Sequence, residues 1–223
     1  MLLPGMDGTG ELFAPLLAAL GADVPVVVVR YPDQPLDYSA HEEIARSALP
    51  IDQPYVLLGE SFSGPIAISI AARSPPGLLG YVLCSSFAKC PRQILRALRP
   101  IVGLFPPQAA PEVLTTYFLM GRFATAELRA LHREVLRQVS PSGLVARLKA
   151  IATVDVSDAL SRIRLPGLYL RATEDRLVPS SAARLFEQLT RGRVVDVEAP
   201  HFLLQANPQV ASRVIRDFMR EVA

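Results

Sequence analysis

The chain has 223 residues, of which 50% are hydrophobic and 20% are charged, and its formal net charge is +2. This length and composition fit one folded domain and exclude a disordered chain. The 23 basic residues, all but two of them arginine, are scattered among acidic residues without a basic block, which argues against nucleic-acid binding.

The cysteine content and the hydrophobic runs restrict the cellular setting. Cys84 and Cys90 are the only two cysteines, which is too few for a disulfide framework, and no zinc-binding motif contains them. They predict a reducing, cytoplasmic setting. No apolar run is long enough to cross a bilayer, and no signal-peptide pattern opens the chain. We therefore expect neither a membrane span nor a metal site.

Apolar runs of strand length recur along the chain and alternate with helical patterns. Runs that are apolar on both faces are typical of a parallel sheet covered by helices on both sides. Their alternation with helices predicts a doubly wound α/β fold. After the end of a strand at 1–3, the expected strands are 24–30, 55–58, 81–84, 167–171 and 193–197.

An early helix is expected after the strand at 24–30. Residues 39–42 have the pattern of a capping box, which predicts a helix that begins near Ser39 and turns His41 toward solvent. Later, Pro65 falls in the first turn of the helix that follows Ser61, where a proline costs little.

Residues 88 to about 153 interrupt the alternation, because this stretch has several prolines and no convincing strand. Its second half predicts a helix over 125–138 and another that opens at Ser140. The apolar face of the second helix consists of Leu144, Leu148 and Ile151. We expect this insertion to form a helical cap over the carboxyl edge of the sheet, where it would line a pocket and exclude water. The alternative is an ordinary pair of packing helices.

The stretch GESFSG at 59–64 joins a predicted strand directly to a predicted helix. So tight a turn requires small neighbours and places Ser61 at its tip in strained backbone, as in a nucleophile elbow. By itself the pattern is equally typical of a βα turn with a solvated serine. A serine nucleophile also needs a base that takes its proton and an acid that orients the base.

Three histidines are candidates for that base. His41 and His132 lie in predicted helices, whereas His201 directly follows the last predicted strand, in a loop over the carboxyl edge of the sheet. Ligands bind at this edge in open α/β folds, so His201 is expected to be the base. The loop after the preceding strand offers two adjacent carboxylates. Asp175 is the preferred acid and Glu174 is the alternative.

An oxyanion that develops during ester cleavage needs two preorganised donors. One is the amide of Phe62, which follows the serine. The other is expected from the glycine-rich loop at 4–10, in which the amide of Met6 is the preferred donor. A phosphate-binding loop is the weaker interpretation, because the segment lacks the lysine of that motif. This chemistry requires no metal and no cofactor.

Four segments resemble the signature regions of the α/β-hydrolase superfamily, namely LLPGMDGTGELF, YVLLGESFSGPIAISIAARSP, LYLRATEDRLVP and APHFLLQANP. The order serine, aspartate, histidine is also that of the superfamily. The pair PGMDGTG and GESFSG is similar to esterase, lipase and thioesterase members, including the hydrolase part of plant phytyl ester synthases. The resemblance covers nearly the whole chain and implies a mainly parallel sheet with a helical cap. It also implies a serine hydrolase of a small hydrophobic carboxylic ester or thioester.

Two positions depart from the family pattern. Pro4 replaces the usual histidine before the oxyanion-loop glycine, and Ser63 replaces the last glycine of the GxSxG motif. Neither change removes a catalytic group. Acyl transfer to an alcohol would use the same groups, and a ligand receptor would keep the fold with negligible turnover. Ser61 argues against a haloalkane dehalogenase or an epoxide hydrolase, since both need an aspartate there.

The resemblance also implies that two strands which precede the oxyanion loop in the family are absent here. The strand expected at 24–30 would then form the edge of the sheet. A long, uncharged, β-branched edge is an association hazard, and Pro25 interrupts it at one point only. The sequence predicts either that the natural reading frame begins upstream of Met1 or that the edge pairs with another chain in an oligomer.

Overall fold

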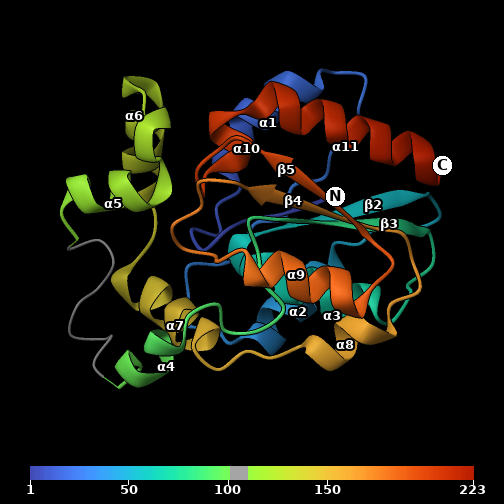
Figure 1. Cartoon of the computed structure of the whole chain (residues 1–223), viewed down its shortest axis with the longest axis horizontal. Helices are drawn as coiled ribbons and strands as arrows, with labels where there is room; N and C mark the ends of the chain where they lie inside the picture. The colour runs from blue at the N-terminus through green and yellow to red at the C-terminus, as the bar shows by residue number, and fades with distance from the viewer. Residues whose placement is uncertain (101–109) are drawn as a thin grey trace.

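The computed structural model describes residues 1–100 and 110–223 and places one sheet between two layers of helices (Figure 1). Neighbouring strands are parallel and stand in the order β1-β2-β3-β4-β5. They are β1 (Leu2–Leu3), β2 (Tyr55–Glu60), β3 (Leu78–Cys84), β4 (Gly167–Ala172) and β5 (Arg193–Val197). The predicted α/β class with a mainly parallel sheet is confirmed.

The segment at 24–30, expected to be a strand, forms only an isolated bridge between Val28 and Leu2. Two backbone hydrogen bonds of 2.8 and 2.9 Å join Leu2 to the residues on either side of Val28. The predicted extent is wrong, because β1 offers only two residues for pairing and Pro25 has no amide to donate. The segment nevertheless lies beside β1 on the side away from β2. The chain therefore first adds this segment outside β1 and then crosses to the opposite side of β1, where the remaining strands follow. Oligomerisation through this edge stays a prediction.

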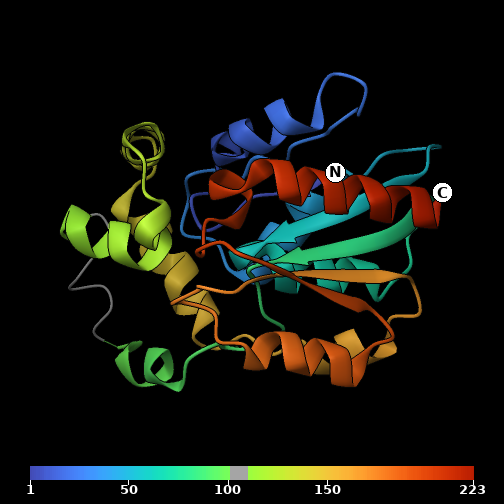
Figure 2. The ribbon, with the colours of Figure 1, turned by 45° about the horizontal axis from the view of Figure 1, so that its top comes forward.

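Helices cover both faces of the sheet, as Figures 1 and 2 show. One face carries α1 (Ala14–Leu20) and α11 (Pro208–Val222), with the short α10 (Leu203–Ala206) before α11. The other face carries α2 (Tyr38–Ser47), α3 (Gly64–Ala71), α8 (Ser157–Arg162) and α9 (Ser181–Leu189). Within the two described ranges, no helix has both the length and the apolar character that a membrane crossing requires.

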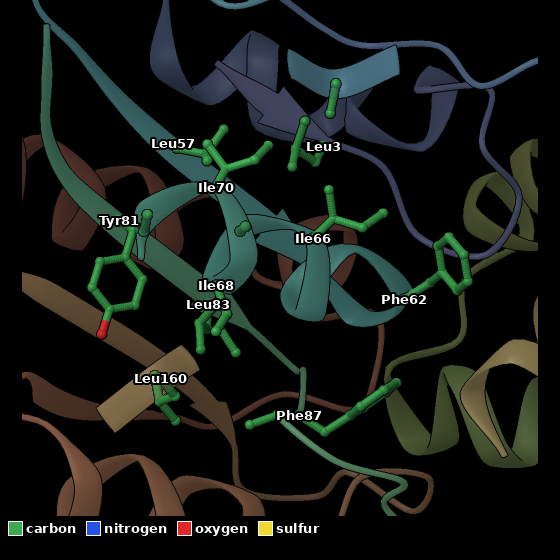
Figure 3. Close-up of a cluster of buried hydrophobic side chains, with 14 of the residues drawn as sticks. Leu3, Leu57, Phe62, Ile66, Ile68, Ile70, Tyr81, Leu83, Phe87 and Leu160 are labelled. Atoms are coloured by element: carbon green, nitrogen blue, oxygen red, sulfur yellow. The ribbon is translucent and has the colours of Figure 1, made fainter. Parts of the chain in front are cut away.

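Each face of the sheet has its own hydrophobic cluster. Figure 3 shows the larger one, in which Leu57 of β2 and Leu83 of β3 share a cluster with Ile66 and Ile70 of α3. These four side chains are at most 1% exposed, and burial of each such side chain contributes about 1.5–3 kcal/mol. Helix α3 is therefore held firmly on the sheet, which fixes the turn at Ser61 that leads into it.

Helix α2 differs from its prediction at the cap. Its N-cap is Asp37, whose carboxylate accepts a hydrogen bond of 2.9 Å from the Ala40 amide, so the expected capping box is wrong. Aspartate caps a helix as well as serine does. His41 is buried rather than solvent-facing, because its ring packs edge-on against the rings of Tyr31 and Phe62. Burial in this aromatic setting lowers the pKa of His41.

The insertion at 88–153 is helical where it is described, and its part at 101–109 lies outside the described residues. It contains α4 (Gln93–Leu98), α5 (Glu112–Leu119), α6 (Ala126–Arg137) and α7 (Pro141–Ile151). Helices α6 and α7 match the two predicted helices, and Ser140 caps α7 by accepting the Gly143 amide. Figure 1 shows α5, α6 and α7 beyond one end of the sheet. Asp33 holds the start of α7 by accepting hydrogen bonds from the amide and hydroxyl of Ser140.

Candidate active site

A strained turn follows β2 and presents Ser61. Its φ is +46°, a left-handed value that is rare for serine and marks stored strain. Two contacts maintain this turn. The Ser86 hydroxyl donates a hydrogen bond of 2.5 Å to the Ser61 carbonyl. A Cβ at Gly64 would lie 1.8 Å from the Ser86 oxygen, so the close approach requires glycine. The local geometry is that of the expected elbow.

The loops after β4 and β5 bring an aspartate and a histidine to this serine. The Nε2 atom of His201 lies 3.0 Å from the Ser61 hydroxyl, and its Nδ1 atom lies 2.8 Å from a carboxylate oxygen of Asp175. The other carboxylate oxygen accepts the Leu177 and Val178 amides at 2.8 and 2.9 Å. With an Nδ1 proton donated to Asp175, Nε2 is free to accept the serine proton.

Glu174, the alternative acid, lies outside this arrangement. Its carboxylate forms an ion pair of 2.7 Å with Arg122, which also pairs with Glu198 at the surface. Arg122 lies in the insertion, just after α5. Of the two adjacent carboxylates, Asp175 is therefore the one that contacts His201.

Two buried titratable groups lie near the serine, and the pKa of each is raised. Burial lowers the pKa of His201, but the charge and hydrogen bond of Asp175 and the charge of Glu60 raise it more, so the net value lies above 6.5. Burial also raises the pKa of Glu60 to about 7, although Gln205 donates a hydrogen bond of 2.9 Å to its carboxylate. Because the two charges interact, the protonation of each depends on the other.

Phe62 and Met6 lie in the two segments expected to supply oxyanion donors. Phe62 is in the first turn of a short 3₁₀ helix (Ser61–Ser63), where the leading amides have no intrahelical partner. Its ring stacks on Tyr38 with the centroids 4.6 Å apart, and the Tyr38 hydroxyl donates a hydrogen bond of 3.1 Å to its carbonyl oxygen. In the turns and loops of the described ranges, no backbone hydrogen bond uses the Met6 amide. The role of both amides as oxyanion donors stays a prediction.

The two departures from the family pattern contact each other. The buried hydroxyl of Ser63 donates a hydrogen bond to the carbonyl oxygen of Pro4. The Tyr31 hydroxyl lies 2.9 Å from the same Ser63 oxygen. The turn at Ser61 and the loop at 4–10 are therefore tied together directly behind the site.

The insertion contacts the histidine loop. A hydrophobic cluster joins this loop, the start of the chain and helix α6, and its buried members are Leu12, Met120, Leu128, Val135 and Phe202. The Phe202 amide donates a hydrogen bond of 2.9 Å to the Leu119 carbonyl. His132 of α6 packs edge-on against the Phe202 ring at 5.4 Å. The neighbour of His201 is thus covered by apolar side chains of the insertion.

Comparison with known proteins settles the family. The family model described as "Alpha/beta hydrolase family" matches residues 1–213. The chain belongs to this family. Since the match spans nearly all of the chain, the predicted superfamily membership of this hydrolase is confirmed.

Curated relatives of the hydrolase include ester-cleaving enzymes. A pimeloyl-[acyl-carrier protein] methyl ester esterase of Neisseria meningitidis is 26% identical over 240 residues, which cover 99% of this chain and 93% of the relative. Phytyl ester synthase 1 of Arabidopsis thaliana is 31% identical over 133 residues, which cover 54% of this chain and 18% of the relative. These relatives confirm the predicted enzyme class, a carboxylic ester hydrolase. They also confirm the predicted likeness to phytyl ester synthases.

Solved structures share the fold of the hydrolase. The enol-lactonase from Burkholderia xenovorans superposes with a TM-score of 0.81 at 19% identity and covers 98% of this chain and 90% of its own. A thermophilic esterase from Thermogutta terrifontis reaches a TM-score of 0.83 at 18% identity, over 99% of this chain and 89% of its own. At such identities, these likenesses show the architecture alone.

Sequence reasoning missed three residues of the hydrolase that surround the site. Glu60 and Gln205 form the buried pair behind Ser61, and Arg147 reaches the loop at 4–10 from α7. Arg147 leaves a visible signal in the sequence, because its spacing from Leu144 places a charge within the apolar stripe of α7. Charged residues are seldom fully buried, so such a position marks a specific partner.

Proposed function

We propose that this hydrolase cleaves a carboxylic ester or thioester through an acyl-enzyme on Ser61. The observation that carries the proposal is the unbroken set of contacts from the Ser61 hydroxyl through His201 to Asp175, at 3.0 and 2.8 Å. The left-handed backbone at Ser61 and the family match support it.

The geometry supports a two-step mechanism. His201 takes the hydroxyl proton of Ser61 as the serine oxygen attacks the acyl carbon, and Asp175 stabilises the imidazolium that forms. The amides of Met6 and Phe62 donate to the oxyanion. His201 then gives its proton to the leaving alcohol or thiol, and the acyl-enzyme remains. Water attacks this acyl group after losing a proton to His201, and the carboxylic acid leaves as the serine regains that proton.

We further propose that residues 1–223 form one domain in which residues 88 to about 153 cap the site. The apolar cluster beside His201 supports this role, because Met120 and Leu128 of the insertion lie in it. A hydrophobic acyl chain would find apolar side chains there rather than water. A small or medium hydrophobic ester or thioester is therefore the proposed substrate, and a cytoplasmic location stays a prediction.

Activity-based labelling tests the nucleophile. A fluorophosphonate probe should modify Ser61 in the folded protein, with the adduct located by peptide mass spectrometry. Ser69→Ala, on the half-buried side of α3, is the matched control and should label like the wild type. Folded wild-type protein that fails to label at Ser61 would favour a ligand receptor.

A substrate panel then separates hydrolysis from acyl transfer and sets the acyl preference. The panel consists of p-nitrophenyl esters and acyl-CoA thioesters of graded length, and methyl esters of dicarboxylic acids in free and carrier-linked form. The last pair follows from the methyl ester esterase among the relatives. Each reaction is repeated with a competing alcohol, and the products are identified and quantified by mass spectrometry. Free acid as the main product supports a hydrolase, whereas a new ester supports an acyltransferase.

The rate should depend on pH through the base. Neutral His201 is needed to take the serine proton, so kcat/KM should rise with pH through a pKa above 6.5. The Glu60 charge raises the His201 pKa, so Glu60→Gln should move this midpoint to lower pH. Glu174→Gln, at the surface, should leave it in place. Profiles of a short ester from pH 5 to 9 measure both effects, and a flat profile would contradict a histidine base.

A further inference from the structure

One guanidinium is buried entirely between the insertion and the core. Arg147 of α7 is 0% exposed. Its Nη1 atom donates to the carbonyls of Met6 and Asp7 at 2.9 and 2.7 Å, and its Nη2 atom donates to the Pro32 carbonyl at 3.0 Å. Its Nε atom faces the Nε2 atom of His41 at 3.4 Å. The guanidinium thus binds three backbone carbonyls and an imidazole rather than a carboxylate.

Burial of this guanidinium opposes folding, because a charged group loses its hydration. Burial lowers the pKa of Arg147, and the charges of Asp7 and Asp33 offset only part of that effect. A buried charge without a hydrogen-bonded carboxylate is tolerated only where its hydrogen bonds are well satisfied. A leucine at this position would continue the apolar stripe of α7, so packing alone does not require the arginine.

The loop at 4–10 is built around this guanidinium. Gly8 has a φ of +76°, and a Cβ there would lie 2.8 Å from Nη1 of Arg147. The Asp7 carboxylate accepts hydrogen bonds from the amide and hydroxyl of Thr9 at 2.9 and 2.6 Å. From the other side, Ser63 holds the Pro4 carbonyl. The backbone at Met6 is therefore fixed between the elbow and helix α7.

We propose that Arg147 is a positioning residue for oxyanion stabilisation. It holds the Met6 and Asp7 carbonyls and so fixes the backbone whose Met6 amide donates to the oxyanion. The inference rests on the proposed function. A fixed donor stabilises the charged tetrahedral state more than the bound ester. Loss of Arg147 should therefore lower kcat more than it changes KM.

Two substitutions at this position test the proposal, with a matched pair elsewhere in the insertion. Arg147→Gln removes the charge, and Arg147→Lys keeps it but loses the planar fork that reaches several carbonyls. The controls are Arg137→Gln and Arg137→Lys, at an exposed arginine of α6 that pairs with Glu134. The measurements are kcat and KM for a short p-nitrophenyl ester and the affinity for butylboronic acid, which forms a tetrahedral adduct on serine.

We expect kcat to fall about 10- to 100-fold in Arg147→Gln, part of the 10²–10³-fold effect of removing one oxyanion donor. Boronate affinity should fall in proportion, KM should change less than about threefold, and Arg147→Lys should lie between wild type and Arg147→Gln. The Arg137 variants should match the wild type.

A purely structural role gives a different pattern. The melting temperature of the Arg147 variants would fall, but kcat and boronate affinity, measured well below that temperature, would stay near wild type. That result overturns the proposal. If Arg147→Gln does not fold, the kcat and boronate affinity of Arg147→Lys decide between the two roles. If neither variant folds, Arg147 holds the structure as a whole and the proposal fails. A wild-type protein that neither cleaves esters nor labels at Ser61 would instead overturn the proposed function itself.

Discussion

Replacing Ser61 by alanine should reduce kcat about 10⁴- to 10⁶-fold, because the acyl-enzyme cannot form without the hydroxyl oxygen. The free energy of unfolding should change little. Alanine has nearly the shape of serine and occupies the same strained backbone at φ +46°. Among residues 1–100 and 110–223, the lost hydroxyl is hydrogen-bonded only to His201. Initial rates with a short p-nitrophenyl ester and urea unfolding curves measure the two quantities.

The control for this variant is Ser69→Ala, which removes a hydroxyl from α3, the helix that follows the turn at Ser61. Its activity and its unfolding curve should both match the wild type. If Ser61→Ala retained more than about a hundredth of the wild-type rate, another residue would be the nucleophile, since a serine nucleophile contributes far more than that.

Asp175→Asn should lower kcat about 10⁴-fold, whereas Glu174→Gln should change it less than about threefold. An asparagine amide facing Nδ1 of His201 favours the wrong tautomer, in which Nε2 carries the proton and cannot accept one from Ser61. Glu174 instead pairs with Arg122 at the surface, so its loss leaves the base untouched. Both variants are compared in kcat and in the pH dependence of kcat/KM.

The opposite ranking would assign Glu174 as the acid. Equal, small effects of both substitutions would show that His201 needs no carboxylate partner. Unfolding curves serve as the control, because Asp175 also accepts the amides of Leu177 and Val178, and asparagine retains an oxygen for them.

The sequence predicted the central strands well because they are buried on both faces. The apolar runs at 55–58, 81–84 and 167–171 lie in β2, β3 and β4, whose residues are mostly buried. The run at 193–197 also has the predicted bounds, although it forms the partly exposed edge strand β5. The run at 24–30 is as apolar as these runs, but the strand predicted there does not form over its full length. Strand formation also depends on a partner strand. That partner, β1, offers two residues, and nothing in the local composition of 24–30 reveals this.

The candidate site was predictable to the extent that topology alone brings residues together. Ser61, Asp175 and His201 each follow a strand of one parallel sheet, so they had to meet at its carboxyl edge. The inward position of His41 and the reach of Arg147 were not predictable in this way. The reach of Arg147 depends on how α7 packs against the loop at 4–10, a contact between residues about 140 positions apart. The burial of His41 depends on its contacts with Tyr31 and Phe62. No local sequence pattern determines either contact.

The hydrogen bond from the Ser63 hydroxyl to the Pro4 carbonyl links the two positions that depart from the family pattern. Proline has no amide hydrogen, so its carbonyl is the only polar backbone group at position 4, and the Ser63 hydroxyl satisfies it in a buried setting. A glycine at 63 would restore the common motif and leave that carbonyl without this donor. Substitutions at 4 and 63 should therefore be non-additive in a double-mutant cycle. A single buried hydrogen bond therefore joins the two departures, and a measurement on either position alone would misstate what that bond contributes to stability.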